Sequence, residues 1–211
     1  MLVLLGALSA LPALSSAEAQ ETGRDARSAR LRAMGRAFLA AGDPGSATGY
    51  FRDAIRVNPD DAEAYVALGR IYLDRGSLSD ALEVFSAGLR RRPDHPPLFR
   101  ALATTLERRG ALADAADALR ALVERAPDDP ESHLARAELA RRRGAWSEAL
   151  GSYRAVVDLA ASGAALTPQR VADARRYVEA LRVLVGESDP VGGARCDHPS
   201  ELRRALAHCE R

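Results

Sequence analysis

The sequence contains no lysine: all 30 of its basic residues are arginine. A phosphate-binding loop of the Walker type and Schiff-base chemistry both need a lysine, so both are excluded. Aromatic residues make up only 5% of the chain, and the β-branched and aromatic runs that predict strands are missing. The formal net charge is +1, so the composition does not indicate a nucleic-acid partner.

A hydrophobic run long enough to span a membrane is also missing. The run Leu2–Leu14 is about 13 residues long, whereas a membrane-spanning helix needs about 20. Small residues at Ala17 and Ala19 follow this run, in the pattern of a secretory signal, although no positive charge precedes it. We predict a signal peptide over residues 1–19, a linker over 20–27, a periplasmic or secreted bacterial protein, and no stable membrane insertion after cleavage. An uncleaved anchor and a cytoplasmic protein are the alternatives.

The clearest feature that the sequence does contain is a repeat with a period of 34 residues. Three series keep this interval: Gly42, Gly76, Gly110 and Gly144; Ala47, Ala81, Ala115 and Ala149; and the bulky residues Phe51, Phe85, Leu119 and Tyr153. Because many positions keep the same phase over several copies, the chain is predicted to repeat one structural unit.

The spacing inside one unit predicts a helical hairpin. In the second unit, apolar residues from Tyr65 to Tyr72 recur at intervals of three and four, which places them on one face of a helix. Gly76 follows as a helix-ending residue, and Phe85 marks a second helix that Pro93 stops. A single hairpin cannot bury its apolar face, so neighbouring units are expected to stack and share a core.

This pattern resembles the tetratricopeptide repeat. The second unit matches it with Tyr65, Leu68, Gly69, Tyr72, Ala81, Phe85 and Pro93. The same unit departs from the pattern at Gly88, where the family usually has alanine. The resemblance implies an all-α fold, a right-handed superhelical stack of hairpins. It covers residues 28–161 in four units: 28–61, 62–95, 96–129 and 130–161.

The residues after the repeats are predicted to cover the last hairpin. Thr167 and Pro168 form a helix start, and Gly186 ends the apolar stripe that follows. We expect a capping helix over 164–186, then a linker and a short cysteine-bearing tail helix over 187–211.

The resemblance also implies a binding surface, because the first helix of each hairpin lines the concave side in this family. Ligand-facing positions by this analogy are Arg32, Arg36, Val66, Arg70, Leu73, Arg100, Thr104, Leu134 and Glu138. Guanidinium groups bind carboxylates in a forked geometry, so the arginines suggest an acidic or C-terminal peptide segment as the ligand. The alternative is that these arginines form a solvated face. The lysine and asparagine of the family's carboxylate-clamp version are absent here.

Two cysteines, Cys196 and Cys209, lie in the tail. An exported chain with one cysteine pair favours a disulfide, which a short tail helix permits only if it ends near Ala207. Cys209 buried on that helix is one alternative, and a metal site with His198 and His208 is another, although the spacing is unlike known zinc sites.

No catalytic cluster is recognisable, since the nucleophile-elbow and dinucleotide-binding motifs are both absent. We therefore predict a non-catalytic scaffold that needs no cofactor and binds a protein or peptide. Two alternatives stay open: a redox- or metal-responsive tail module docked by the repeats, and a self-assembling repeat protein.

Overall fold

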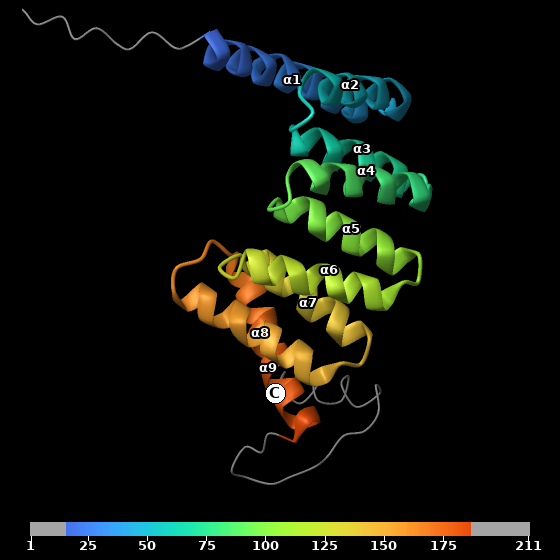
Figure 1. The fold of residues 1–211 in the computed structure, drawn as a ribbon. Helices are drawn as coiled ribbons and strands as arrows, with labels where there is room; N and C mark the ends of the chain where they lie inside the picture. The colour runs from blue at the N-terminus through green and yellow to red at the C-terminus, as the bar shows by residue number, and fades with distance from the viewer. Residues whose placement is uncertain (1–15, 187–211) are drawn as a thin grey trace, which may run out of the picture. The chain divides into compact units, whose positions relative to one another are not determined.

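The computed structural model describes residues 16–186, and these form helices with no strand among them (Figure 1). In chain order the helices are α1 (Ser16–Ala40), α2 (Pro44–Val57), α3 (Ala62–Asp74), α4 (Leu78–Arg91), α5 (Pro96–Arg108), α6 (Leu112–Arg125), α7 (Pro130–Arg142), α8 (Trp146–Ala161) and α9 (Pro168–Val185). The chain divides into two compact units, Met1–Ala64 and Tyr65–Arg211. The fold is an all-α stack of helical hairpins, as the periodicity predicted.

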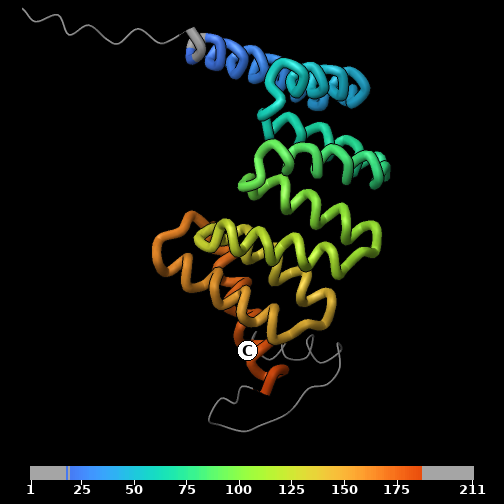
Figure 2. Tube along the Cα trace, in the orientation of Figure 1, coloured from blue at the N-terminus to red at the C-terminus, as the bar shows by residue number. Residues whose placement is uncertain are grey.

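The trace in Figure 2 turns sharply between the two helices of each hairpin. A glycine with positive φ lies at each of these turns. The φ angles are 77° at Gly42, 76° at Gly76, 85° at Gly110 and 71° at Gly144. These values lie in the left-handed region, which glycine adopts without the steric cost that a Cβ brings. The 34-residue glycine series therefore marks four equivalent turns.

The core of each hairpin is built from the repeated small and bulky residues. Ala47, Ala81, Ala115 and Ala149 are completely buried, and the bulky series Phe51, Phe85, Leu119 and Tyr153 is at most 3% exposed. A Cβ added at Gly69 would lie 2.3–2.8 Å from three carbons of the Phe85 ring. Gly69 is therefore required for the close approach of the two helices in its hairpin.

Residues 20–27 form part of α1, so the prediction of a linker there is wrong. This stretch contains no proline, and only Gly23 among its residues weakens a helix. The helix is also tied to α2, because the Nδ2 of Asn58 donates to Oδ1 of Asp25 over 2.7 Å. Tertiary contacts of this kind stabilise a helix beyond its local propensity.

Helix α9 packs against α8 at the end of the repeats. Thr167 caps it, since its hydroxyl oxygen accepts from the backbone N–H of Arg170 over 3.4 Å, and Gly186 ends it at a φ of 70°. Ala174 and Leu181 of α9 are buried in one cluster with Tyr153 of α8. The helix thus begins at the predicted Thr167–Pro168 start and ends before Gly186, whereas residues 164–167 of the predicted capping helix lie in the loop before it.

Candidate functional site

The predicted ligand-facing residues are divided between the two units. Arg32 and Arg36 belong to the first unit, and the others belong to the second. Arg36 and Arg70 are exposed, whereas Val66 and Leu73 are only 6% and 7% exposed. Val66 and Leu73 are therefore core residues, and their prediction as ligand-facing is wrong. Helix α3 buries apolar residues around most of its circumference. A position next to the predicted core stripe of this helix is therefore not necessarily exposed to solvent.

Arg32 and Arg100 form equivalent ion pairs, two repeat periods apart. Nε of Arg32 lies 2.8 Å from Oδ2 of Asp61, and Nη1 of Arg100 lies 2.9 Å from Oδ2 of Asp129. Each aspartate also caps the first helix of the following hairpin. Asp61, for example, accepts from the backbone N–H of Ala64 over 3.2 Å. Each arginine therefore fastens the first helix of one hairpin to the start of the next.

We expect replacement of Arg100 by methionine to lower the free energy of unfolding by about 1 kcal/mol, since the pair is about 30% exposed and Asp129 keeps its capping bonds. Arg120→Met is the matched control, because Arg120 and Asp117 form a pair that is about 60% exposed. That control should change stability by less than about 0.5 kcal/mol in urea denaturation. Equal losses in the two variants would contradict a fastening role for Arg100.

Helices α5 and α7 enclose a hollow of about 140 Å³ on the first-helix face of the second unit. We call it the α5–α7 hollow, and it is lined by Arg100, Ala103, Thr104, Glu107, Leu119, Ala135, Glu138, Leu139 and Arg142. Three of the predicted positions, Arg100, Thr104 and Glu138, meet here. Thr104 is exposed, and its hydroxyl donates to the carbonyl oxygen of Arg100 over 2.9 Å.

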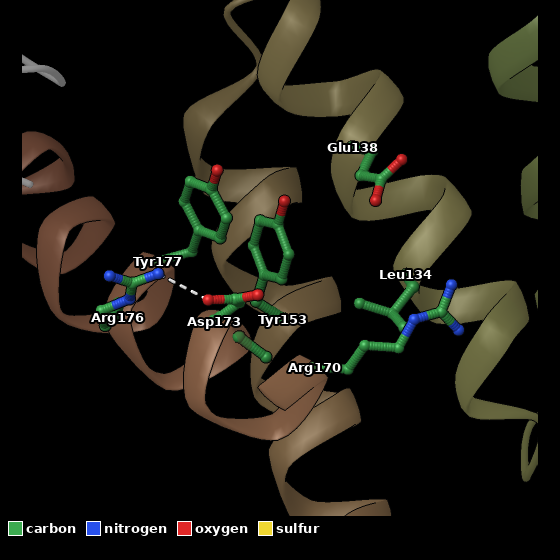
Figure 3. A pocket seen from close by; sticks show the side chains of 8 residues that line it. Leu134, Glu138, Tyr153, Arg170, Asp173, Arg176 and Tyr177 are labelled. Carbon is green, nitrogen blue, oxygen red and sulfur yellow. Dashed lines mark hydrogen bonds and ion pairs between the residues drawn. The ribbon is translucent and has the colours of Figure 1, made fainter. Parts of the chain in front are cut away.

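A larger hollow of about 330 Å³ lies between α7, α8 and α9 (Figure 3). We call it the α7–α9 hollow, and it is lined by Leu134, Glu138, Tyr153, Arg170, Asp173, Ala174, Arg176 and Tyr177. Glu138 lines both hollows, so the two adjoin at its side chain. The residues from α9 were not predicted, because α9 lies outside the repeat and no repeated position corresponds to it.

Two stacked tyrosines form one wall of the α7–α9 hollow. The ring centroids of Tyr153 and Tyr177 are 4.8 Å apart with an interplanar angle of 15°, and Figure 3 shows both hydroxyls pointing to the same side. The guanidinium carbon of Arg141 lies 5.3 Å from the Tyr177 centroid. Burial raises the pKa of Tyr153 to about 12, and the charge and hydrogen bond of Arg141 oppose this only in part. The Tyr153 hydroxyl is therefore neutral at physiological pH.

The basic side chains of the two hollows are already paired with carboxylates of the protein. Arg100 pairs with Asp129, Arg142 with Glu107, Arg170 with Glu131, and Arg176 with Asp173. The Arg142 pair is bidentate, with N–O distances of 2.5 and 2.7 Å. Glu138 differs, since its side chain is 54% exposed and its ion pair with Arg142 is long, at 3.9 Å. Of the four predicted arginines, Arg32 and Arg100 are thus engaged by carboxylates, whereas Arg36 and Arg70 are exposed.

Two family models, both described as tetratricopeptide repeat, match residues 32–96 and 75–139 and so jointly cover 32–139. The chain belongs to the tetratricopeptide-repeat family. Tetratricopeptide repeats are interaction modules that bind proteins or peptides and are generally not catalytic. No curated protein matches the chain.

Solved structures of other tetratricopeptide-repeat proteins share the fold. MamA from Desulfovibrio magneticus RS-1 is 17% identical with a TM-score of 0.59, over 87% of this chain and 92% of that one. A repeat protein from Parabacteroides merdae is 17% identical with a TM-score of 0.60, over 88% of this chain and 68% of that one. YrrB, described as a tetratricopeptide-repeat protein with an unusual peptide-binding site, is 18% identical with a TM-score of 0.57, over 94% of this chain and 99% of that one. At these identities the likeness extends to the fold alone.

Residues 16–186 are the part of the chain that the structure describes. In that range no group of three or more His, Cys, Asp or Glu side chains is placed to hold a metal ion. Within the same range no helix has the length and apolar character needed to cross a membrane. Cys196 and Cys209 lie outside the described residues, so the disulfide between them stays a prediction, as do its alternatives.

Proposed function

We propose that this tetratricopeptide-repeat protein is a non-catalytic scaffold that binds a peptide segment of a partner protein along the α5–α7 and α7–α9 hollows. The observation that carries the proposal is that the two hollows adjoin at Glu138, which makes one continuous surface lined by residues of α5, α6, α7, α8 and α9. Ligand sites are typically concave and combine apolar walls with a few polar groups.

The side chains around the two hollows suit an extended peptide. Ala103 and Ala135 are small, so they leave room for a backbone between α5 and α7. Leu134 and Leu139, at 9% and 2% exposed, form an apolar floor beneath the surface, and the exposed Thr104 offers a hydroxyl. Affinity in such a surface comes from a few anchoring side chains, with the remaining contacts supplying complementarity.

A substitution that fills the surface tests this function. Thr104 is exposed and lines the α5–α7 hollow, so Thr104→Trp should leave the fold intact while obstructing the peptide. Peptides selected by the wild-type chain from a phage-displayed library of short random sequences should bind this variant at least roughly tenfold more weakly, as measured by isothermal titration calorimetry. Ala113→Trp on α6 is the matched control, because Ala113 is also exposed and lies away from both hollows. Unchanged affinity for Thr104→Trp would contradict the proposal.

We also propose that the chain acts in the bacterial cell envelope after cleavage behind Ala19. The apolar run Leu2–Leu14 and the small residues Ala17 and Ala19 support this. Protein purified from its native cells should then begin at Gln20 by N-terminal sequencing, and an intact Met1 would contradict export by this route.

A further inference from the structure

We infer that the α7–α9 hollow receives a basic side chain, arginine or lysine, of the bound peptide, with Glu138 as the carboxylate that recognises it. This inference rests on the proposed function and names the chemistry of the partner segment. It replaces the acidic ligand that the arginines of the sequence suggested.

The arginines that line the α7–α9 hollow already have carboxylate partners. Arg170 forms an ion pair with Glu131, and Arg176 lies 2.5 Å from Asp173. Asp173 also accepts from the side-chain amide of Gln169 over 3.0 Å. An anionic ligand would have to break one of these pairs before it gained a partner. It would thus exchange one ion pair for another, with little net gain.

Glu138, in contrast, forms a long ion pair. Within residues 16–186, the ion pair of its carboxylate is the 3.9 Å contact with Arg142, and Arg142 is already engaged by Glu107 through two shorter contacts. A ligand cation can therefore approach Glu138 without displacing a close partner. Charge-assisted hydrogen bonds to a carboxylate are about twice as strong as neutral ones. A cation of the peptide therefore gains more binding energy at Glu138 than at a neutral polar group of the hollow.

The shape and polarity of the α7–α9 hollow also suit a basic side chain. Arginine and lysine carry a long apolar stem below a charged head, and they bury the stem along apolar surface. Leu134 lies one helical turn from Glu138 on α7, and the Tyr153 ring stands nearby in Figure 3. The charge of Glu138 also contributes to the raised pKa of the Tyr153 hydroxyl, which places the carboxylate within electrostatic reach of that ring. A volume of about 330 Å³ admits one such side chain.

Arg141 also lies near the hollow. Its guanidinium carbon lies 5.3 Å from the centroid of the Tyr177 ring, and its charge lowers the pKa of Tyr153, but it is not among the residues that line the hollow. Glu138, in contrast, lines the hollow with a side chain that is 54% exposed.

The test is a selection from a phage-displayed library of short random peptides against the folded full-length chain. We expect the wild type to enrich arginine and lysine over aspartate and glutamate by about tenfold at one peptide position. Glu138→Gln, which keeps the shape and removes the charge, should abolish that enrichment. Glu124→Gln is the matched control, since Glu124 is exposed on α6 and lines neither hollow; it should keep the wild-type preference. The preference should also weaken as salt rises, because exposed charges are screened.

The possible failures are distinguishable. Peptides that bind the wild type and Glu138→Gln with the same basic preference would overturn the role of Glu138 and leave peptide binding intact. Enrichment of acidic residues by the wild type would overturn the inference in the same way. If a chain with the helical circular dichroism of the fold selects no peptide above background, the proposed function fails, and this inference fails with it.

Discussion

Replacement of Phe85 by alanine is expected to lower the free energy of unfolding by about 3–5 kcal/mol. The Phe85 ring is completely buried and faces Gly69, which has no side chain that could move into the vacated space. The substitution therefore removes a large apolar side chain and leaves a cavity that the surrounding helices fill only in part. Urea denaturation followed by far-ultraviolet circular dichroism measures the loss.

The control for this prediction is Leu112→Ala, because Leu112 is 40% exposed on α6 and has little burial to lose. Leu112→Ala should lower the free energy of unfolding much less than Phe85→Ala does. The single tryptophan, Trp146 at the start of α8, gives a second probe through its fluorescence. In a repeat protein each unit contributes its own stability and that of its interfaces, so the two probes show whether the array unfolds as one. A loss under about 1 kcal/mol for Phe85→Ala would contradict the packing described above.

The second large effect is expected at Asp61, in the first unit. Asp61→Ala should lower stability by about 2–4 kcal/mol, because one 9%-exposed carboxylate serves three partners. It pairs with Arg32 at 2.8 Å, accepts from the hydroxyl of Ser28, and caps α3 through the Ala64 N–H. Its loss leaves Arg32, whose side chain is only 20% exposed, without its counter-ion. Thermal and urea denaturation both report this change.

Asp53→Ala provides the comparison for Asp61. Asp53 also pairs with an arginine at 2.8 Å, but the Asp53 and Arg56 side chains are 48% and 78% exposed. Water and salt screen such a pair, so the variant should lose less than about 0.5 kcal/mol. If the two aspartate variants were equally stable, the account of Asp61 as a shared buried acceptor would be wrong.

The parts of the fold that the sequence predicted are those set by local helix geometry. The turn glycines, the buried alanines and the series from Phe51 to Tyr153 recur at 34 residues because each unit repeats the same hairpin. The extension of α1 to Ser16 was missed, because residues before the first repeat have no repeated phase to identify them.

The candidate site was predicted less well, because it depends on contacts between hairpins. Thr104 and Glu138 do line hollows, but Arg100 is engaged by Asp129 from the start of the next first helix. The spacing of 29 residues recurs between Arg32 and Asp61, and this was the signal in the sequence that could have revealed the pairing. Tyr177 comes from α9, outside the repeat, so only the packed structure brings it to the site.

Hydrogen–deuterium exchange of the full-length chain, with and without a peptide selected by the wild type, tests the central claim most directly. The account predicts the largest slowing of amide exchange in α5, α7 and α9 when the peptide is bound, and a smaller change in α6 and α8, which contribute Leu119 and Tyr153 to the hollows. Slower exchange confined to α6 and α8 would place the binding surface on the second helices and contradict the account.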